Sequence, residues 1–420
     1  MVLFQLLQIA IGYRKELSHY PTDKEWNSLY NNCKIQSVLG FAFSGIQKLP
    51  EEQMPPSELY AKWQREALME NERRNKVAEI CRKTCETHEK NGFNSCVLMP
   101  TSVVVRGERL EVRDEIGEFR GGDPKDIDIL CWSKDKKNGK RTIVEYVNFQ
   151  YVSSTKHIKP KVVRQHVDWK SGHIPMNVNF KSSYLNCPWY NKRLEVWVRE
   201  MVERPLTHTP MLSTSNFPPP SPVEREPEGD NTTTLRGNLC ELPVEFYVVY
   251  QLLHLYKRFF CEDLRFGHLL EYYYTLKTLY LLSLHRESAR HPQSPCVGEE
   301  DTPMIERAGV QPSPPMQGDI EGLIENLGMR KFAGAVMYVL QTVFAMSDEY
   351  LLCKPDVRHG SFVLKMTNLA GEYGRAYERT RTLSHLGKIG RYLYWIKRNR
   401  PFITQYPSEM LFETYRKIVG

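Results

Sequence analysis

Two aspartates stand two residues apart in the segment GGDPKDIDIL, which covers residues 121–130. A glycine turn leads into a strand in which acidic and aliphatic residues alternate, and side chains two residues apart in a strand point to the same face. The carboxylates of Asp126 and Asp128 would then lie side by side, as Mg²⁺ ligands that bridge to substrate phosphates do. The pattern predicts metal-assisted phosphoryl transfer. A half-exposed edge strand with two solvated aspartates is the open alternative.

The segments around these aspartates predict the small sheet that must position them. Residues that are β-branched, aromatic or alternating in polarity predict strands at 93–99, 126–130, 142–152, 166–169 and 176–180. A short segment that contains Gly172 and Pro175 joins the last two, which predicts a hairpin. A helix through Leu194 and Trp197 is expected to close this region.

Helical patterns occupy both ends of the chain. Near the N-terminus, polar residues precede apolar residues at helical spacing, and an Asn-Gly pair follows the longest such stretch. The expected caps and stop are Thr22 or Asp23, Ser57, and Asn91-Gly92. The expected C-terminal helices cover 242–284, 333–344 and 386–398. The aromatic run at 272–274 is expected to pack in the core of the first of them, with ligand stacking as the alternative.

The predicted elements and the shifts in composition divide the chain into four parts, and the order of helices and strands predicts an α+β fold. Residues 1–92 form a helical region, and residues 93–203 form an α/β core that carries the aspartates. Residues 204–238 are rich in Pro and Ser, which predicts a flexible linker. Residues 239–420 form a helical domain, with an insertion at 286–318 whose composition predicts disorder.

The overall composition is that of a globular protein. Hydrophobic residues make up 41% and charged residues 25%, which excludes fibrous and wholly disordered classes. The net charge of +7 suits an anionic ligand such as a nucleotide but is too diffuse to indicate nucleic acid. The 10 cysteines form no C-x-x-C pair, so we expect free thiols in a cytoplasmic protein. No apolar run is long enough to predict a membrane span.

Several segments, in order, resemble the large uncharacterised nucleotidyltransferase family in its helical-extended bacterial form. GDPKDIDIL resembles the family's metal motif, usually written G-D-I-D-hydrophobic, with Pro124 and Lys125 inserted nearby. MNVNFKSSYLNCPWYNKRLEVWV resembles its V-E-V-H-F strand and the segment after it. Further similar segments are LLQIAIG, LPVEFYVVYQLLHLYKRFF, LLEYYYTL, LGMRKFAGAVMYVLQTVF, EYLLCKPD and QYPSEMLF.

The resemblance implies a small mixed sheet with helices on its faces and helical extensions at both ends. It also implies a Mg²⁺- or Mn²⁺-dependent nucleotidyltransferase, with Asp126 and Asp128 as catalytic metal ligands. The expected substrates are an NTP and an unknown acceptor, either a small molecule or a protein. No membrane partner is expected.

The chain departs from the family pattern at two places. Where the family has Lys-Gly after the first strand, this chain has LMPTS at 98–102, and a proline has no N–H for a phosphate. Thr101 and Ser102 could supply hydroxyl contacts instead, or could be ordinary loop residues. Asn177 stands at the third-carboxylate position and Asn179 at the histidine position. An amide carries no charge and cannot act as a general base.

Two other residues are candidates for the site. If the predicted hairpin pairs Asp168 with Asn177, cross-strand proximity would let Asp168 replace the missing metal ligand. Arg120 resembles an arginine that precedes the family's metal motif, and it either contacts a phosphate of the nucleotide or is solvated.

Three functions therefore remain open. The first is a nucleotidyltransferase that moves a nucleoside monophosphate from an NTP to an acceptor. The second is a catalytically degenerate relative, a pseudoenzyme, that binds a nucleotide or a partner protein. The third, a nucleic-acid-binding module, rests only on the basic and aromatic stretch at 388–400, which is better explained as an amphipathic packing helix.

Overall fold

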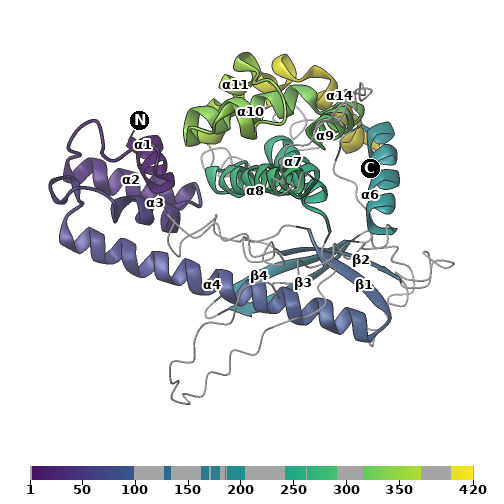
Figure 1. Cartoon of the computed structure of the whole chain (residues 1–420), viewed down its shortest axis with the longest axis horizontal. Coiled ribbons are helices and arrows are strands. Elements are labelled where there is room, and N and C mark those ends of the chain that lie inside the picture. Colours follow the sequence, from purple (N-terminus) through teal and green to yellow (C-terminus); the bar gives the residue numbers. More distant parts are fainter. Residues whose placement is uncertain are drawn as a thin grey trace, which may run out of the picture.

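The computed structural model describes the backbone of residues 2–98, 127–133, 162–169, 172–179, 185, 187–203, 242–261, 263–290, 316–369 and 399–419. These residues form a largely helical α+β structure around one small mixed sheet, so the predicted fold class is confirmed at this level. The sheet lies between the long helix α4 on one face and helices α7 and α8 on the other (Figure 1).

The N-terminal helices begin and end largely where the sequence predicts. Thr22 caps its helix in a capping box, in which its Oγ1 accepts from Glu25 N and Glu25 Oε2 accepts from Thr22 N at 2.8 Å. The elements are α1 (Val2–Ile11), α2 (Asp23–Ile35), α3 (Leu39–Ile46), a 3₁₀ turn (Glu51–Gln53) and α4 (Ser57–Lys90).

The ends of α4 show one wrong prediction and one confirmed prediction. Ser57 does not cap the helix but is its first residue, because Pro56, in an extended conformation, holds the cap position. At the other end, Asn91 is the C-cap and Gly92 follows with φ of +83°, in the left-handed region that favours glycine.

The described residues form four strands of the sheet, in the order β1-β2-β4-β3. The strands are β1 (Phe93–Val97), β2 (Ile127–Ser133), β3 (Val162–Trp169) and β4 (Gly172–Asn179). β2 is antiparallel to β1 and parallel to β4, and β3 and β4 form an antiparallel hairpin. The predicted hairpin is confirmed, but Gly172 and Pro175 lie within β4 rather than in its connection. The predicted strand at 142–152 lies outside the described residues.

The two faces of the sheet meet different cores. One face packs Ile127, Ile129 and Met176 against Val77 and Cys81 of α4. The other face presents Leu130 and Cys96 to the main hydrophobic core. That core extends from Leu3 to Met410, so the N-terminal and C-terminal helices share it.

The C-terminal half is helical. The elements are α6 (Pro188–Glu203), α7 (Val244–Cys261), α8 (Phe266–Arg290), α9 (Met316–Asn326), α10 (Arg330–Phe344), a 3₁₀ turn (Asp348–Tyr350), α11 (Val357–Asn368), a helix at 399–405, and α14 (Pro407–Val419). Tyr272 and Tyr273 are buried in α8, as predicted for packing residues. Both ends of the predicted insertion at 286–318 are helical instead, because α8 continues to Arg290 and α9 begins at Met316.

Some predicted segments lie outside the described residues. They are the linker at 204–238, the middle of the insertion and the basic stretch at 388–398. The seven cysteines whose side chains are described are free thiols. None of the described helices combines the length and apolarity needed to cross a bilayer.

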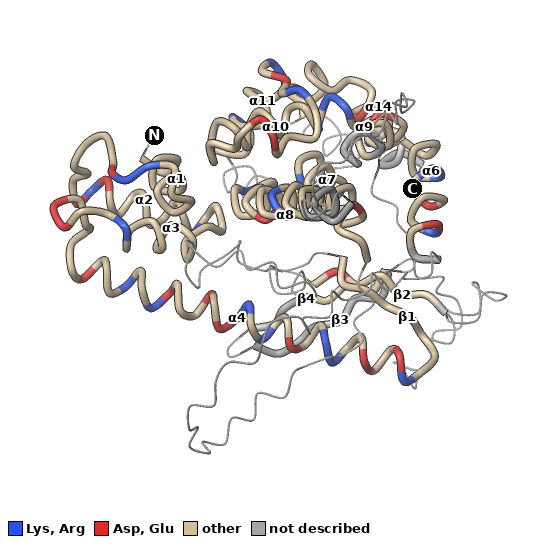
Figure 2. Tube along the Cα trace, in the orientation of Figure 1, with Lys and Arg blue, Asp and Glu red and all other residues tan. Residues whose placement is uncertain are grey.

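Charged side chains on α4 are mixed in sign rather than gathered into a basic surface. Figure 2 shows Lys and Arg interleaved with Asp and Glu along this helix. The ion pairs that join neighbouring turns include Lys76 with Glu79 at 2.8 Å and Arg82 with Glu86 at 2.6 Å. This pattern is typical of a solvated helix face and gives no support for nucleic-acid binding there.

Candidate functional site

Of the residues predicted to bind a metal or a nucleotide, one is described together with its side chain. Asp128 lies on β2, between Ile127 and Ile129, whose side chains face α4. Four other predicted residues lie outside the described residues, namely Thr101, Ser102, Arg120 and Asp126. For Asp168 and Asn177, the backbone register of the strands is described.

Asp128 is held inside the molecule by the neighbouring strand. The residue is 4% exposed, and Asn177 of the parallel strand β4 is its register partner. Two residues further along β4, the side-chain amide of Asn179 donates to Asp128 Oδ1 at 3.2 Å, and to the carbonyl oxygen of Ile129 at 3.4 Å. Asn179 is also buried. A neutral N–H group therefore faces one oxygen of the carboxylate.

Helix α7 supplies the group that faces the second oxygen. His254 Nδ1 lies 3.9 Å from Asp128 Oδ2, and the imidazole side chain is 3% exposed. Burial, the positive charge of Arg258 and that of Lys257 lower the pKa of His254 well below its usual value. The imidazole is therefore neutral at pH 7 and carries one proton.

A hydrogen bond on the far side of the ring decides where that proton lies. Arg258 Nε donates to His254 Nε2 at 3.0 Å, and a guanidinium has no acceptor atom. Nε2 must then be the unprotonated nitrogen, so Nδ1, which lies 3.9 Å from Asp128 Oδ2, carries the hydrogen. Each carboxylate oxygen is thus faced by a neutral donor, Asn179 Nδ2 on one side and His254 Nδ1 on the other.

Asp168, the predicted replacement for the missing metal ligand, does not lie opposite Asn177. β3 and β4 pair Asp168 with His173, whereas Arg164 is the partner of Asn177. Four strand residues separate Asp168 from that position, a distance of roughly 13 Å. The prediction that Asp168 lies opposite Asn177 is wrong because Trp169 pairs with Gly172, so the hairpin reverses earlier than Gly172 and Pro175 suggested.

The described donors do not fit a Mg²⁺ site. A protein Mg²⁺ site takes several oxygen ligands, and the amide N–H of Asn179 uses one of the acceptor positions of Asp128. Within the described ranges, no group of three or more His, Cys, Asp or Glu side chains is arranged to hold a metal ion. The second predicted metal ligand, Asp126, belongs to the part of the chain that is not described.

Sequence reasoning missed the contribution of α7. Gln251, His254 and Arg258 recur at spacings of three and four residues, so they share one side of the helix, called here the α7 polar face. The aromatic and aliphatic residues between them predict only that the helix packs in the core. The signal in the sequence was three polar residues at helical spacing on a strongly apolar helix, which indicates a polar side of that helix.

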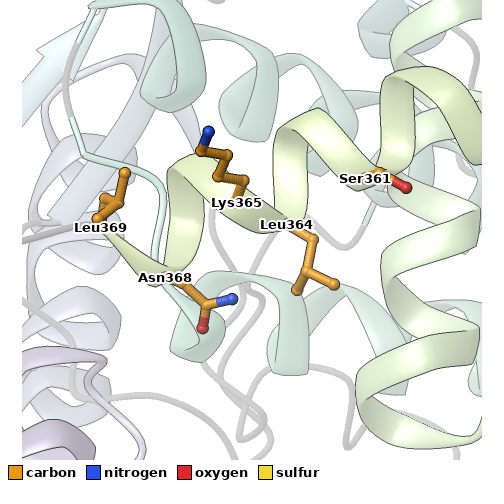
Figure 3. A pocket seen from close by; sticks show the side chains of 5 residues that line it. All are labelled: Ser361, Leu364, Lys365, Asn368 and Leu369. Carbon is orange, nitrogen blue, oxygen red and sulfur yellow. The ribbon is translucent and has the colours of Figure 1, made fainter.

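Hollows on the surface lie elsewhere. One of about 370 Å³ lies against α11 and is lined by Ser361, Leu364, Lys365, Asn368 and Leu369 (Figure 3). A second, of about 550 Å³, is lined partly by Gln8, Arg14 and Gln341. Neither lining includes Asp128 or the α7 polar face, and neither gathers groups suited to catalysis.

The described side chains near Asp128 include its own buried carboxylate, two neutral donors and one guanidinium. Such a cluster can bind a polar group by hydrogen bonds. Among family models, curated proteins and solved structures, no match to this chain is found, so any functional assignment rests on these residues.

Proposed function

We propose that this protein is a nucleotidyltransferase-like protein that binds a nucleotide but no longer transfers a nucleoside monophosphate. The observation that carries the proposal is the hydrogen bond from Asn179 Nδ2 to Asp128 Oδ1, at 3.2 Å. It couples the strand of the metal motif to the strand on which the resembled family has an acid and a histidine. Here both positions, 177 and 179, are asparagines.

The loss of transfer follows from charge. Phosphoryl transfer needs cations held by several carboxylates, and a base or an oriented nucleophile. Asn177 and Asn179 supply no negative charge, and neither can remove a proton from an incoming hydroxyl. A buried amide that donates to Asp128 stabilises this carboxylate without a cation.

Retention of nucleotide binding has separate support. The resemblance covers most of the chain, and the mixed sheet with a parallel β2–β4 pair is compatible with a nucleotidyltransferase core. The net charge of +7 favours an anionic ligand. Arg258 adds positive charge beside His254.

An active Mg²⁺- or Mn²⁺-dependent nucleotidyltransferase is the second candidate, and one observation favours it. The register places position 177 directly beside Asp128 on parallel strands, which is where a shared metal ligand would stand. In that case Asp126 and Asp128 would be the catalytic pair and would suffice without a third carboxylate. The acceptor hydroxyl could belong to a small molecule or a protein.

Binding and turnover can be separated in one set of measurements. We expect ATP, GTP, CTP or UTP to raise the melting temperature of the wild-type protein, because a ligand specific for the folded state stabilises it. We expect no release of labelled pyrophosphate when Mg²⁺ or Mn²⁺ is added. The variant Asn177→Asp, which restores a carboxylate beside Asp128, should show increased metal binding by calorimetry.

Two results would decide against the proposal. Pyrophosphate release by the wild type that Asp128→Asn abolishes would establish the active enzyme instead. A melting temperature indifferent to all four nucleotides would remove nucleotide binding. Asn27→Asp, an exposed substitution on α2, is the matched control for the added charge.

A further inference from the structure

The hollow of about 550 Å³ lies where α1 and α10 both end. Its volume is in the range of pockets that bind small molecules. One wall is the end of α1 with the turn after it, and the other is the end of α10 with the turn after it. The side-chain amide of Gln8 joins the two walls, because it donates to the carbonyl oxygens of Thr342 and Val343 at 3.4 and 3.3 Å. The hollow therefore lies between two elements that are fixed against each other.

The first wall carries a positive charge. The chain turns after α1 at Gly12, whose φ of +93° lies in the left-handed region that favours glycine. The backbone N–H groups of Tyr13 and Arg14 then both donate to the carbonyl oxygen of Gln8, at 2.9 and 3.3 Å. Arg14 is exposed, and its guanidinium has no hydrogen-bond or ion-pair partner among the described residues. A fixed backbone thus presents an unpaired cation to the hollow.

The second wall carries a negative charge. Ala345 is the C-cap of α10, and the chain then reaches the 3₁₀ turn that begins at Asp348. The side-chain amide of Gln341 donates to Asp348 Oδ1 at 2.5 Å, which fixes the direction of the carboxylate. Asp348 is exposed, and no described residue donates to its second oxygen, Oδ2. This oxygen is available to a ligand.

The two opposite charges line the same hollow without pairing with each other. Arg14 and Asp348 both belong to the lining, yet no ion pair joins them in the described structure. The C-terminal end of α10 adds negative partial charge near Asp348, and neither α1 nor α10 has a basic residue in its last turn. An anion alone would be repelled by Asp348, and a cation alone would be repelled by Arg14. A molecule that carries both a carboxylate and an ammonium group satisfies both walls.

We propose that this hollow binds a free α-amino acid, whose carboxylate accepts from the guanidinium of Arg14 and whose ammonium group donates to Asp348. A guanidinium presents parallel N–H groups that match the two oxygens of a carboxylate. The ring of Tyr13, which lines the hollow and is 66% exposed, offers an apolar surface to the side chain of the amino acid. The site is separate from the sheet, so it does not depend on the proposed nucleotide binding.

Binding is first detected by thermal stability. The melting temperature of the wild-type protein is measured with each of the standard amino acids at about 10 mM, without nucleotide. We expect at least one of them to raise it, because a ligand specific for the folded state stabilises that state. Calorimetry then compares this amino acid with the amine that lacks its carboxylate and with the acid that lacks its ammonium group. Each analogue should bind at least about tenfold more weakly, since a charge-assisted hydrogen bond is lost.

Two variants assign these charges to residues. Arg14→Gln should weaken binding of the amino acid at least about tenfold but should not weaken binding of the amine. Asp348→Asn, which keeps the oxygen that accepts from Gln341, should weaken binding of the amino acid similarly but should not weaken binding of the acid. This pattern identifies the residue that contacts each charged group of the ligand.

Lys15→Gln and Glu349→Gln are the matched controls. Both residues are exposed and adjacent in sequence to Arg14 and Asp348, but neither lines the hollow, so binding should be unchanged. The proposal is overturned if no amino acid binds the wild-type protein, or if full affinity survives in both Arg14→Gln and Asp348→Asn. Equal binding of the amino acid and its two analogues would also overturn it. None of these outcomes bears on nucleotide binding, because the hollow shares no residue with the α7 polar face or Asp128.

Discussion

The described residues include two His–Asp pairs that differ in origin. His359 and Asp356 lie three residues apart at the start of α11, with Nδ1 and Oδ2 separated by 2.6 Å. His254 and Asp128 come from α7 and β2, 126 residues apart in the chain, and their facing atoms are 3.9 Å apart. The first pair forms within the first turn of α11. The second pair forms only because α7 packs on the sheet.

The local pair has a structural task that its geometry explains. Asp356 is the N-cap of α11, and its Oδ1 accepts from the backbone N–H of His359 at 3.0 Å. Its second oxygen contacts the His359 ring, so both oxygens serve the end of one helix. The long separation in the Asp128 pair is therefore a property of that site and not of His–Asp pairs in this chain.

Removal of the buried carboxylate should produce the largest change in stability. We expect Asp128→Ala to lower the free energy of unfolding by about 3 kcal/mol, because the donors Asn179 Nδ2 and His254 Nδ1 lose the carboxylate that they face. Urea denaturation monitored by circular dichroism measures this change. Asp128→Asn, which retains an acceptor oxygen, is the control and should be much less destabilising. A loss below 1 kcal/mol for Asp128→Ala would mean that the carboxylate does not organise its neighbours.

A second negative charge on β4 should have the next largest effect, and it should depend on pH. In Asn179→Asp, two carboxyl groups would share the buried position, and their repulsion raises the pKa of the pair in the folded protein. A raised folded pKa means that the destabilisation, about 2 kcal/mol at pH 7, is relieved as the pH falls through that value. Urea midpoints measured from pH 4 to pH 8 test this. A destabilisation that does not vary with pH would contradict the proximity of the two groups.

The contrast between the pairs also explains what could be predicted from the sequence. Helix ends depend on a few adjacent residues, so the Thr22 cap and the Asn91-Gly92 stop were correctly predicted. Asp356 and His359 form a similarly short pattern, and a search for caps ahead of α11 would have found it. The prediction that Ser57 caps α4 was wrong because Pro56, directly before it, occupies the cap position.

The candidate site could be predicted only in part. The strand with Asp128 and the hairpin after it followed from alternation of residue types, but the register of β3 on β4 did not. A shift in the position of the turn displaces every pair along a hairpin, and this displaced Asp168 from Asn177. His254 could not be found by strand patterns at all, since it reaches Asp128 through packing of a helix far along the chain.

The local pair should give the smallest effect, and this effect should decrease only as the pH falls below the usual pKa of an aspartate. Burial raises the pKa of Asp356, but hydrogen bonds from the backbone and ring of His359 outweigh it, and the net pKa lies below the usual 3.8. A lowered folded pKa stabilises the protein above pH 3.8, and this contribution is lost as the pH falls through the folded value. We expect Asp356→Ala to destabilise by about 1 kcal/mol at pH 7, as loss of a helix cap does, and by less near pH 3. Urea denaturation of both proteins at the two pH values measures the difference, with Asp356→Asn, which can still cap α11, as the control. A destabilisation as large as that of Asp128→Ala would contradict the distinction between a pair that caps one helix and a pair that joins a helix to the sheet.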